Sequence, residues 1–348
     1  MATGGIRMSE SVTMNDIRDL AHVMSKKNSI MGIPLGGAKI GIVGDPESED
    51  KDSKLQAFAK MAEDLLRTKI LVGEDMGLTS SDVKKVYQSI QFDPSELVIE
   101  TLSKKGIPIQ LPAGKTVDDL LSKDFMDYLA GFGLLEAIEE SAVVSDIDLT
   151  QSKVALQGFG TVGSGIAMLL INKGATISAI SDVNHCVYRD EGFSFEELRS
   201  LQGVGGNLNI SQLTNFKKLN RDKIFSLPVD IFVPASVSNV INSENASSIQ
   251  AKLIVEGANL PTTKDAEKIL MKQNKLILPD FVVNAGSAVG FGLLITGQAE
   301  FDDVFEVCAT RIRSVVKTIL SESIEKNSTP RKVAMEVMDN NMKIMRPN

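Results

Sequence analysis

The chain has 348 residues, more than one domain usually contains, so two domains are expected. Hydrophobic residues make up 43% of the sequence, and no uninterrupted apolar run approaches the roughly 20 residues that a membrane helix needs. The formal net charge of −8 argues against nucleic acid as the main partner. We therefore expect a soluble globular protein that binds neither membrane nor nucleic acid.

Cysteine and histidine are too scarce for the common disulfide and metal sites. The only cysteines are Cys186 and Cys308, which favours the reducing cytoplasm, and the first residues show no signal-peptide pattern. His185 adjoins Cys186, but no third ligand is apparent, so no metal site is predicted. With His22 as the only other histidine, acid–base chemistry is expected to use Lys, Asp or Glu.

The first part of the chain, up to about residue 131, mixes glycine-rich turns with helices. Apolar residues recur at helical spacing over residues 16–24 and 54–66. Residues 106–127 are irregular and contain proline and glycine, so they form the candidate hinge region, and a helix is predicted over 129–140.

From Lys153 onwards, short apolar runs alternate with helical segments. The runs predict strands at residues 154–156, 176–180, 230–233, 253–255 and 276–278. Strands that alternate with helices predict a parallel, doubly wound sheet. The chain ends in two segments, 305–320 and 331–345, that have the pattern of amphipathic helices.

The strand predicted at residues 154–156 runs directly into a Gly-x-Gly-x-x-Gly motif, and a predicted helix follows. In such a motif Gly158 permits the tight turn, Gly160 lets the backbone approach a pyrophosphate, and Gly163 lets the helix pack closely on the sheet. Unpaired N–H groups at the start of the helix, at Thr161 and Val162, would bind phosphates. The motif in this context predicts dinucleotide binding.

Asp182 lies at the end of the next predicted strand, 24 positions after Gly158. A carboxylate there would accept a hydrogen bond from a free ribose 2′-hydroxyl, which favours NAD. However, Ser181 could occupy the strand end instead, and Arg189 could reach a 2′-phosphate. The choice between NAD and NADP therefore stays open.

Two further loops follow apolar strands of the same predicted sheet. Ala235 and Ser236 follow one strand, and Ala258 and Asn259 follow the next. Open sheets bind ligands at the carboxyl ends of their strands, so these residues are candidate cofactor contacts. Ordinary strand-to-helix turns, which have a similar composition, are the alternative.

The first region carries lysines and a carboxylate among glycines: Lys27, Lys39 after Gly36 and Gly37, and Asp75. Glycine turns could bring such side chains to a cleft. A lysine that is desolvated or lies near other cations can lose its proton near neutral pH and act as a base. A solvated surface lysine is the alternative.

Several motifs occur in one order along nearly the whole chain. They include Gly-Gly-Ile-Arg at 4–7, Lys-Asn at 27–28, Pro-Leu-Gly-Gly-Ala-Lys at 34–39, Glu-Asp-Met-Gly at 74–77, and the runs at 44–46, 157–163, 232–235, 255–262 and 279–286. Together they resemble the glutamate/leucine/phenylalanine/valine dehydrogenase family. The resemblance implies NAD(P)-dependent oxidative deamination of an L-amino acid to a 2-oxo acid and ammonia.

The resemblance also implies an α/β fold of two domains. Residues 1–131 would form a substrate domain with a mixed sheet, completed by C-terminal helices at about 318–348. Residues 132–317 would form a Rossmann-type, doubly wound NAD(P)-binding domain. A cytoplasmic homo-oligomer with a small-molecule amino acid substrate is implied as well.

Site residues carry over by position. Lys27 falls where the family binds the substrate α-carboxylate, with backbone contacts from Gly4 and Gly5. Lys39 matches the lysine that activates water and supports the carbinolamine, and Asp75 matches the aspartate that shuttles protons at the amino nitrogen. In the cofactor domain, Ala258 and Asn259 match cofactor contacts, and Asn284 matches a residue near the nicotinamide.

Two positions bear on the substrate. Glutamate-specific relatives have a lysine directly before the Gly-Gly pair and a serine seven residues after the Asn of Asn-Ala-Gly, where this chain has Thr3 and Phe291. A buried carboxylate without a cationic partner would be costly, so an aliphatic side chain is favoured, with glutamate as the alternative. The Gly-Asp-Pro run at 44–46 also resembles the leucine-type branch.

Two departures from the family pattern leave a further alternative open. Ala130 stands where relatives have a threonine near the nicotinamide amide. A few dozen residues that build an assembly sheet precede the Gly-Gly turn in relatives, whereas here the turn begins at residue 4, so a shortened chain or an unusual oligomer is expected. The alternative is a catalytically silent, nucleotide-binding regulatory paralogue.

Overall fold

The computed structural model describes residues 1–104, 123–203 and 206–345, and the chain divides into two compact units. Unit 1 comprises residues 1–126, 288–308 and 338–348, and unit 2 comprises residues 127–287 and 309–337. Most of the candidate hinge region at 106–127 lies outside the described residues.

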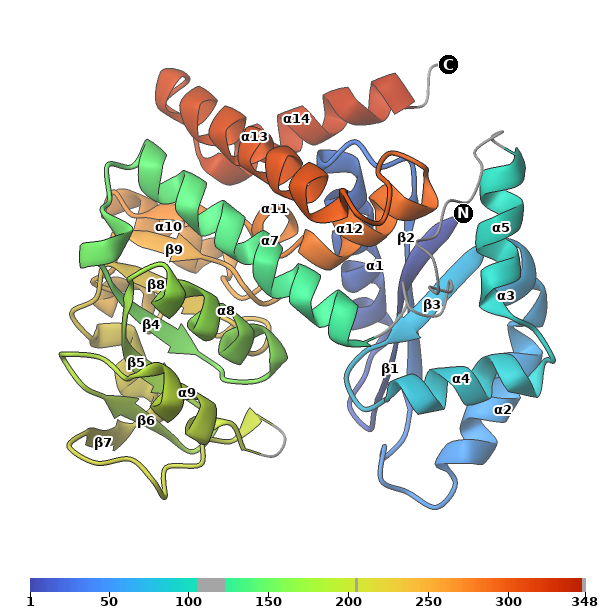
Figure 1. Cartoon of the computed structure of the whole chain (residues 1–348), viewed down its shortest axis with the longest axis horizontal. Coiled ribbons are helices and arrows are strands. Elements are labelled where there is room, and N and C mark those ends of the chain that lie inside the picture. The colour runs from blue at the N-terminus through green and yellow to red at the C-terminus, as the bar shows by residue number, and fades with distance from the viewer. Residues whose placement is uncertain (105–122, 204–205, 346–348) are drawn as a thin grey trace. The chain divides into compact units, whose positions relative to one another are not determined.

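Unit 1 contains a three-stranded sheet in the order β2-β1-β3 (Figure 1). β1 (Ala2–Ser9) pairs in parallel with both β2 (Gly36–Val43) and β3 (Ile70–Glu74). The expected α/β class is confirmed, but the mixed sheet expected here is not seen among the described strands of this unit. Helices connect each strand to the next, and a crossover of that kind returns the chain in the parallel direction.

The helices of unit 1 begin where the sequence supplies capping groups. α1 starts after Thr13, whose hydroxyl accepts from the backbone N–H of Asp16, while the Asp16 carboxylate accepts from the N–H of Thr13. The helix expected over 54–66 is interrupted at Ala62, so two helices occupy the segment. Over residues 1–104, unit 1 contains the helices α1 (Met14–Ile30), α2 (Lys51–Met61), α3 (Glu63–Thr68), α4 (Ser80–Ser89) and α5 (Pro94–Lys104).

Unit 2 contains a seven-stranded sheet in the order β10-β9-β8-β4-β5-β6-β7. The five predicted strands are all present and parallel: β4 (Lys153–Gln157), β5 (Thr176–Ser181), β8 (Ile231–Pro234), β9 (Leu253–Val255) and β10 (Leu276–Leu278). Most of their residues are buried, as in a parallel sheet covered by helices on both faces.

Two strands of unit 2 were not predicted. β6 (His185–Tyr188) pairs antiparallel with β5, and β7 (Lys217–Asn220) pairs antiparallel with β6. Only three residues separate β5 from β6, which is enough for a hairpin but not for the crossover that a parallel pair requires. The wholly parallel sheet expected for this region is therefore wrong at this edge.

The remaining helices continue through unit 2 to the C-terminus. They are α7 (Lys123–Val144), α8 (Thr161–Asn172), α9 (Phe195–Leu201), α10 (Lys264–Lys272), α11 (Asp280–Val283), α12 (Gly286–Ile295), α13 (Val304–Glu325) and α14 (Pro330–Met345), with short 3₁₀ segments at Leu149–Gln151, Arg221–Ser226 and Ala246–Ser248. The two amphipathic helices predicted at the end of the chain correspond to α13 and α14.

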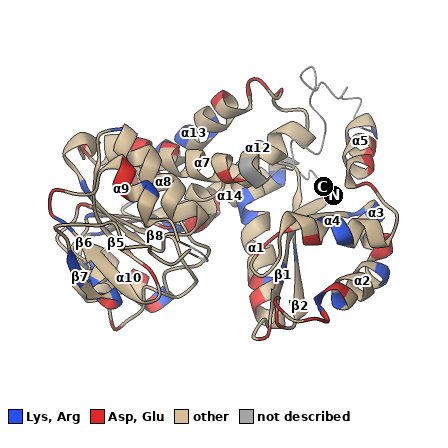
Figure 2. Cartoon of the chain, turned by 60° about the horizontal axis from the view of Figure 1, so that its bottom comes forward, with Lys and Arg blue, Asp and Glu red and all other residues tan. Residues whose placement is uncertain are grey.

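Charged residues of both signs lie on the surface helices (Figure 2). Between α2 and α4 they form ion pairs, with Lys51 2.8 Å from Asp82 and Lys85 2.7 Å from Asp52. These contacts tie α4, which follows β3, to α2. None of the helices with described positions is both long and apolar enough to cross a membrane.

A close approach of α7 to the start of α12 gives a test of the packing in unit 2. A Cβ on Gly133 would lie 2.6 Å from Gly286 Cα. We predict that Gly133→Ala lowers the free energy of unfolding by about 1–3 kcal/mol because the helices must separate. Gly165 in α8 is the matched control, because its Cβ would meet nothing within 4 Å. Gly165→Ala should be neutral or stabilising by about 0.5–1 kcal/mol. Urea denaturation measures both values, and equal effects would contradict the packing argument.

Candidate active site

Unit 1 brings Lys39 and Asp75 together although they come from opposite edges of the three-stranded sheet. Lys39 lies in β2 and Asp75 directly follows β3, with β1 between the two strands. Their side chains meet across β1, with Lys39 Nζ 2.9 Å from Asp75 Oδ2. Gly5 permits the contact, because a Cβ there would lie 3.0 Å from Asp75 Cβ and 3.3 Å from Lys39 Nζ. A larger residue at position 5 would crowd the pair.

The loop that carries Asp75 is fixed to β1 by its backbone. The N–H of Met8 donates to the carbonyl of Met76 at 2.9 Å. Gly77 has a φ of +84°, and a Cβ on it would lie 2.1 Å from the Met8 carbonyl oxygen. Only glycine adopts this conformation at this distance without strain. The Glu-Asp-Met-Gly motif thus sets the position of Asp75.

Arg7 is a third member of this cluster that the sequence analysis missed. Its Nε donates to Asp75 Oδ2 at 2.8 Å, the same oxygen that Lys39 contacts. Arg7 appeared in the sequence only as the end of the Gly-Gly-Ile-Arg motif and received no role. Its spacing of two residues from Gly5 was the available signal, because alternate residues of a strand point to the same face.

Burial and charge shift both titrating groups. The Lys39 side chain is 7% exposed, and this burial lowers its pKa below the ordinary 10.5; Asp75 opposes the shift, and Arg7 adds to it. Burial alone would raise the pKa of Asp75, but Lys39 and Arg7 outweigh it, so that pKa lies below 3.8. Lys39 can therefore lose its proton more readily than a solvated lysine, while Asp75 stays ionised.

The predicted substrate-binding residues are also in unit 1. Lys27 is buried in the last turn of α1, two residues after Ser25, whose hydroxyl accepts from the N–H of Gly37 in β2 at 3.0 Å. Thr3 is buried in β1, directly before Gly4 and Gly5, which lie within the strand and do not form the turn expected from the sequence. Their roles toward a substrate stay predictions.

Phe291 is buried in α12, in the part of that helix that belongs to unit 1. The next residue, Gly292, packs against the segment that follows α1: a Cβ on it would lie 2.6 Å from Ile33 Cγ2. The position of Phe291 is therefore fixed by close packing, and its role in substrate choice stays a prediction.

In unit 2 the three glycines of the motif have different functions in the turn. Gly158 has a φ of +97°, and its N–H donates to the Ser181 carbonyl at 2.8 Å. A Cβ on Gly163 would lie 2.1 Å from the Gly158 oxygen, so α8 could not pack on the turn with a larger residue there. A Cβ on Gly160, by contrast, would meet nothing within 4 Å. The structure thus leaves open space at the glycine predicted to approach a pyrophosphate.

The surroundings of this turn are ordered by the neighbouring strand. α8 begins at Thr161, with Gly160 as its N-cap and no side-chain hydrogen bond to the cap. Ala235 N–H donates to the Gln157 carbonyl at 2.7 Å, and Ser236 Oγ donates to Gln157 Oε1 at 2.7 Å. The first-turn amides of α8, which include those of Thr161 and Val162, lack helical acceptors and suit an anion.

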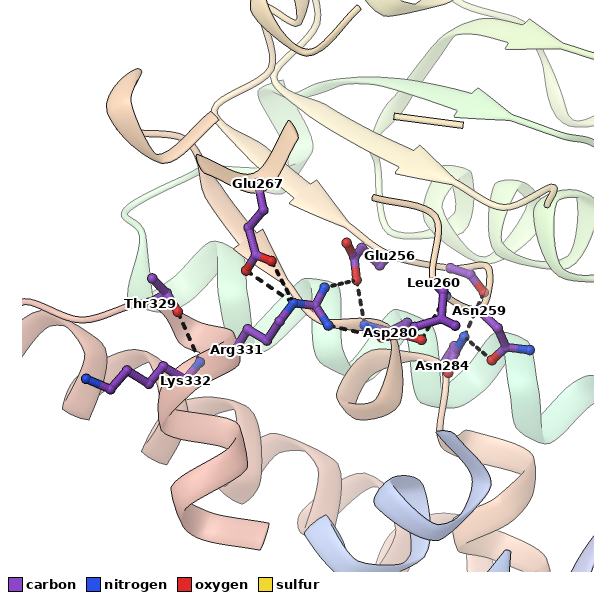
Figure 3. Close-up of polar contacts among 10 residues, drawn as sticks. Glu256, Asn259, Leu260, Glu267, Asp280, Asn284, Thr329, Arg331 and Lys332 are labelled. Atoms are coloured by element: carbon purple, nitrogen blue, oxygen red, sulfur yellow. Dashed lines mark hydrogen bonds and ion pairs between the residues drawn. The ribbon is translucent and has the colours of Figure 1, made fainter. Parts of the chain in front are cut away.

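Asn284 lies where two loops of unit 2 meet (Figure 3). Its Nδ2 donates to the Gly257 carbonyl and to Asn259 Oδ1, both at 3.2 Å, and the N–H of Ala258 donates to the Pro234 carbonyl at 2.8 Å. The Oδ1 of Asn284 is buried without a hydrogen-bond partner among the described residues. A buried amide oxygen in this state is costly and suits a ligand that supplies a donor. Together with the open space at Gly160, these features fit a dinucleotide that ends in a carboxamide.

Asp182 is held differently from the sequence expectation. Its carboxylate accepts from two N–H groups of the turn that follows it, at 2.7 and 2.8 Å, and from the N–H of Leu208 at 2.7 Å. The side chain is 1% exposed. Burial opposes ionisation, yet these bonds and His185 keep the pKa of Asp182 below 3.8. The carboxylate anchors backbone here, and a bond to ribose stays a prediction.

Arg189, the alternative contact for a 2′-phosphate, is engaged within unit 2. Its Nη2 lies 2.7 Å from Glu197 and donates to the Thr214 carbonyl at 2.7 Å. Cys186 and Cys308 are buried, and neither is in a disulfide within the described part of the chain. Over residues 1–104, 123–203 and 206–345, no three His, Cys, Asp or Glu side chains are grouped as metal ligands would be.

One α/β unit thus holds an ion pair between a buried lysine and a partly buried carboxylate, and the other holds a dinucleotide-type glycine turn. The chain belongs to the Glutamate/Leucine/Phenylalanine/Valine dehydrogenase family, whose profile matches residues 126–343. The Glu/Leu/Phe/Val dehydrogenase dimerisation domain matches residues 1–92. The resemblance inferred from the motifs is confirmed.

Curated relatives are named as glutamate dehydrogenases. The glutamate dehydrogenase of Aeropyrum pernix is 35% identical over 286 residues, which are 82% of this chain and 66% of that protein. The NADP-specific glutamate dehydrogenase of Saccharolobus shibatae is 32% identical over 293 residues, with the same coverage. The NAD-specific enzyme of Peptoniphilus asaccharolyticus is 28% identical over 291 residues. The chain spans just under two thirds of the length of the first two proteins.

Solved structures share the fold. The hetero-hexameric glutamate dehydrogenase from Thermus thermophilus in its Leu-bound form aligns with a TM-score of 0.81 and 23% identity, covering 99% of this chain and 81% of that one. The L-tryptophan dehydrogenase from Nostoc punctiforme aligns with a TM-score of 0.67 and 21% identity, covering 99% and 88%. At these identities the likeness establishes the fold alone.

The Lys39 cluster predicts pKa shifts of opposite sign in two variants. Asp75→Asn removes the charge that holds the lysine proton, so the pKa of Lys39 should fall further. Arg7→Met removes a nearby cation, so the pKa should rise. Acetylation of Lys39 by acetic anhydride, followed by peptide mass spectrometry across a pH series, measures both pKa values. Shifts in the same direction would show that the three charges do not interact as described.

Proposed function

We propose that this chain catalyses the NAD(P)-dependent oxidative deamination of an L-amino acid to a 2-oxo acid and ammonia. The observation that carries the proposal is the buried Lys39, whose pKa is lowered and whose Nζ lies 2.9 Å from Asp75. Family membership supports it, as do relatives named as NAD-specific and NADP-specific dehydrogenases. Because the match spans just under two thirds of some relatives, the activity is a proposal for this chain.

In this proposal Asp75 and Lys39 of unit 1 carry out different proton transfers. Asp75, kept ionised by Lys39 and Arg7, accepts a proton from the substrate ammonium, so that a neutral amine can assist hydride loss from the α-carbon. A bound nicotinamide supplies the hydride acceptor. Lys39 in its unprotonated form then accepts a proton from the water that adds to the imine carbon, and Asp75 returns its proton to the nitrogen. The C–N bond breaks as the carbinolamine hydroxyl loses its proton to Asp75, which gives the 2-oxo acid and ammonia. Burial favours both steps because it disfavours the charged forms: it promotes loss of the Lys39 proton and opposes the two cations that lower the pKa of Asp75.

The binding residues are assigned in two groups. Lys27, with the backbone of Gly4 and Gly5, binds the α-carboxylate. The cofactor is held by Gly158, Gly160, Thr161, Val162, Gly163, Asp182, Ala235, Ser236, Ala258, Asn259 and Asn284. Support for the second group comes from the open space at Gly160, the uncapped start of α8 and the unpartnered Asn284 oxygen.

Two observations favour different side chains for the substrate. Thr3 and Phe291 are both buried and neither could neutralise a distal carboxylate, which supports an aliphatic substrate. The names of the curated relatives support glutamate instead. A homo-oligomer is part of the proposal, supported by the match to a dimerisation domain.

Replacing Lys39 tests the reaction. Lys39→Met should lower kcat by about 10²- to 10⁴-fold, the usual contribution of a general base, and leave the Kd for the reduced cofactor unchanged. The measurements are absorbance of the reduced cofactor with NAD and NADP over a panel of L-amino acids, and cofactor fluorescence. If the unaltered protein binds a dinucleotide but oxidises none of the amino acids, the regulatory paralogue is the better account.

Replacing Thr3 tests the substrate pocket. If position 3 faces the end of the substrate side chain, Thr3→Lys should raise kcat/KM for L-glutamate relative to L-leucine, because it supplies the missing cation. Thr3→Met is the matched control: it adds similar bulk at this buried position without charge. Thermal denaturation of both variants separates a pocket effect from misfolding. An unchanged glutamate-to-leucine ratio in Thr3→Lys would refute the assignment of Thr3.

A further inference from the structure

Arg331 contacts three carboxylates at the start of α14 (Figure 3). Its Nη2 lies 2.7 Å from Glu256 Oε2, its Nε lies 3.0 Å from Glu267 Oε2, and its Nη1 lies 3.4 Å from Asp280 Oδ1. The start of the helix is fixed by Thr329, whose hydroxyl accepts from the N–H of Lys332 at 3.0 Å. All these residues belong to unit 2.

Two of these carboxylates also hold the backbone. Glu256 and Asp280 are each 0% exposed. Glu256 Oε2 accepts from the N–H of Asp280 at 2.9 Å, and Asp280 Oδ2 accepts from the N–H of Leu260 at 2.9 Å. Arg331 is therefore linked to the backbone of Asp280 through Glu256, and to the backbone of Leu260 through Asp280.

These segments carry Asn259 and Asn284. Leu260, next to Asn259, has a φ of +51°, a conformation that a bulky residue keeps only where neighbouring contacts hold it. Asp280 begins the single turn of α11, and its carbonyl accepts from the N–H of Asn284 at 3.0 Å. The bonds to Asp280 thus fix the backbone beside both asparagines, and Asn284 in turn donates to Asn259.

We propose that Arg331 is a positioning residue for the nicotinamide end of the cofactor: through Glu256 and Asp280 it holds the 257–260 loop and Asn284 in the geometry that receives the carboxamide. The inference rests on the proposed function, which assigns these two asparagines to the cofactor. Arg331 itself touches neither of them in the contacts that the structure shows.

The charge balance explains why a cation is needed at this position. Burial, and to a smaller extent the charge of Asp280, raise the pKa of Glu256 to about 7, while Arg331 opposes the shift. Without Arg331, two buried carboxylates would lie close together, and no other described residue forms an ion pair with either of them. Either one takes up a proton or the loop opens to water, and both changes alter the bonds that hold Leu260 and Asp280.

The test compares Arg331→Met with Arg331→Lys and a surface control. Lys326→Met is the control because Lys326 also pairs with two carboxylates, Glu322 and Glu336, but at a partly exposed site. For each protein, Kd is measured for NADH and for ADP-ribose, which lacks nicotinamide; if the unaltered protein prefers NADPH, the 2′-phosphate forms replace both. Arg331→Met should raise the Kd for the reduced cofactor at least about tenfold and leave that for ADP-ribose within about twofold. Lys326→Met should change neither.

Arg331→Lys keeps the charge but not the fork of donors, so it should give an intermediate ratio of the two Kd values. If Arg331→Met fails to fold, the same Kd comparison is made with Arg331→Lys alone. The proposal would be overturned if the folded variants kept the ratio of the two Kd values found in the unaltered protein, including the case in which both ligands bind more weakly by the same factor.

Hydrogen exchange in the ligand-free proteins separates this inference from the proposed function. Amides of residues 257–260 and 280–284 should exchange faster in the Arg331 variants, with β4 and α8 unchanged. If exchange rises there but the unaltered protein binds no dinucleotide, Arg331 still positions the loop and the proposed function fails. If dinucleotide binds normally and exchange does not rise, the Arg331 proposal fails and the proposed function stands.

Discussion

The ion pair between Lys39 and Asp75 depends on the absence of a side chain at Gly5. These two residues come from strands on either side of β1, so their side chains can meet only where the central strand leaves room. Arg7, on the same strand, then adds a second cation to the same carboxylate oxygen. The result is a lysine that burial drives toward its neutral form beside a carboxylate that two cations keep ionised. That combination supports proton transfer in both directions.

Unit 2 contains a cluster with the opposite charge pattern, in which one cation contacts several carboxylates. There, one guanidinium from the start of α14 contacts Glu256, Glu267 and Asp280, two of which are fully buried. In both units a buried charge is retained beside residues assigned to ligand binding, where an apolar core would avoid the cost of desolvation. We interpret these buried charges as groups that are kept despite their desolvation cost because they fix the backbone or the protonation state of the binding residues.

The structure departs from the sequence expectations where long-range pairing decides. Arg7 bonds to a residue 68 positions away, and Arg331 to one 75 positions away, so no local pattern showed which carboxylates the two arginines contact. The hairpin of β6 on β5 was missed because β6 begins with a polar residue, His185, and lies between polar turns. The carboxylate of Asp182 also accepts from three backbone N–H groups, a use that the sequence did not show because it depends on where the chain near Leu208 returns.

The sequence by itself determined the α/β class, the family, the glycine turn and the candidate status of Lys39 and Asp75. These are carried by local features: glycine spacing, strand-length apolar runs and ordered motifs. Only the tertiary structure decided which charges meet. Lys39, Asp75 and Arg7 converge because β1 lies between β2 and β3, and Arg331 reaches Glu256 because α14 begins beside the ends of β9 and β10. Strand order and helix docking follow from packing over the whole chain, and short segments of sequence do not contain that information.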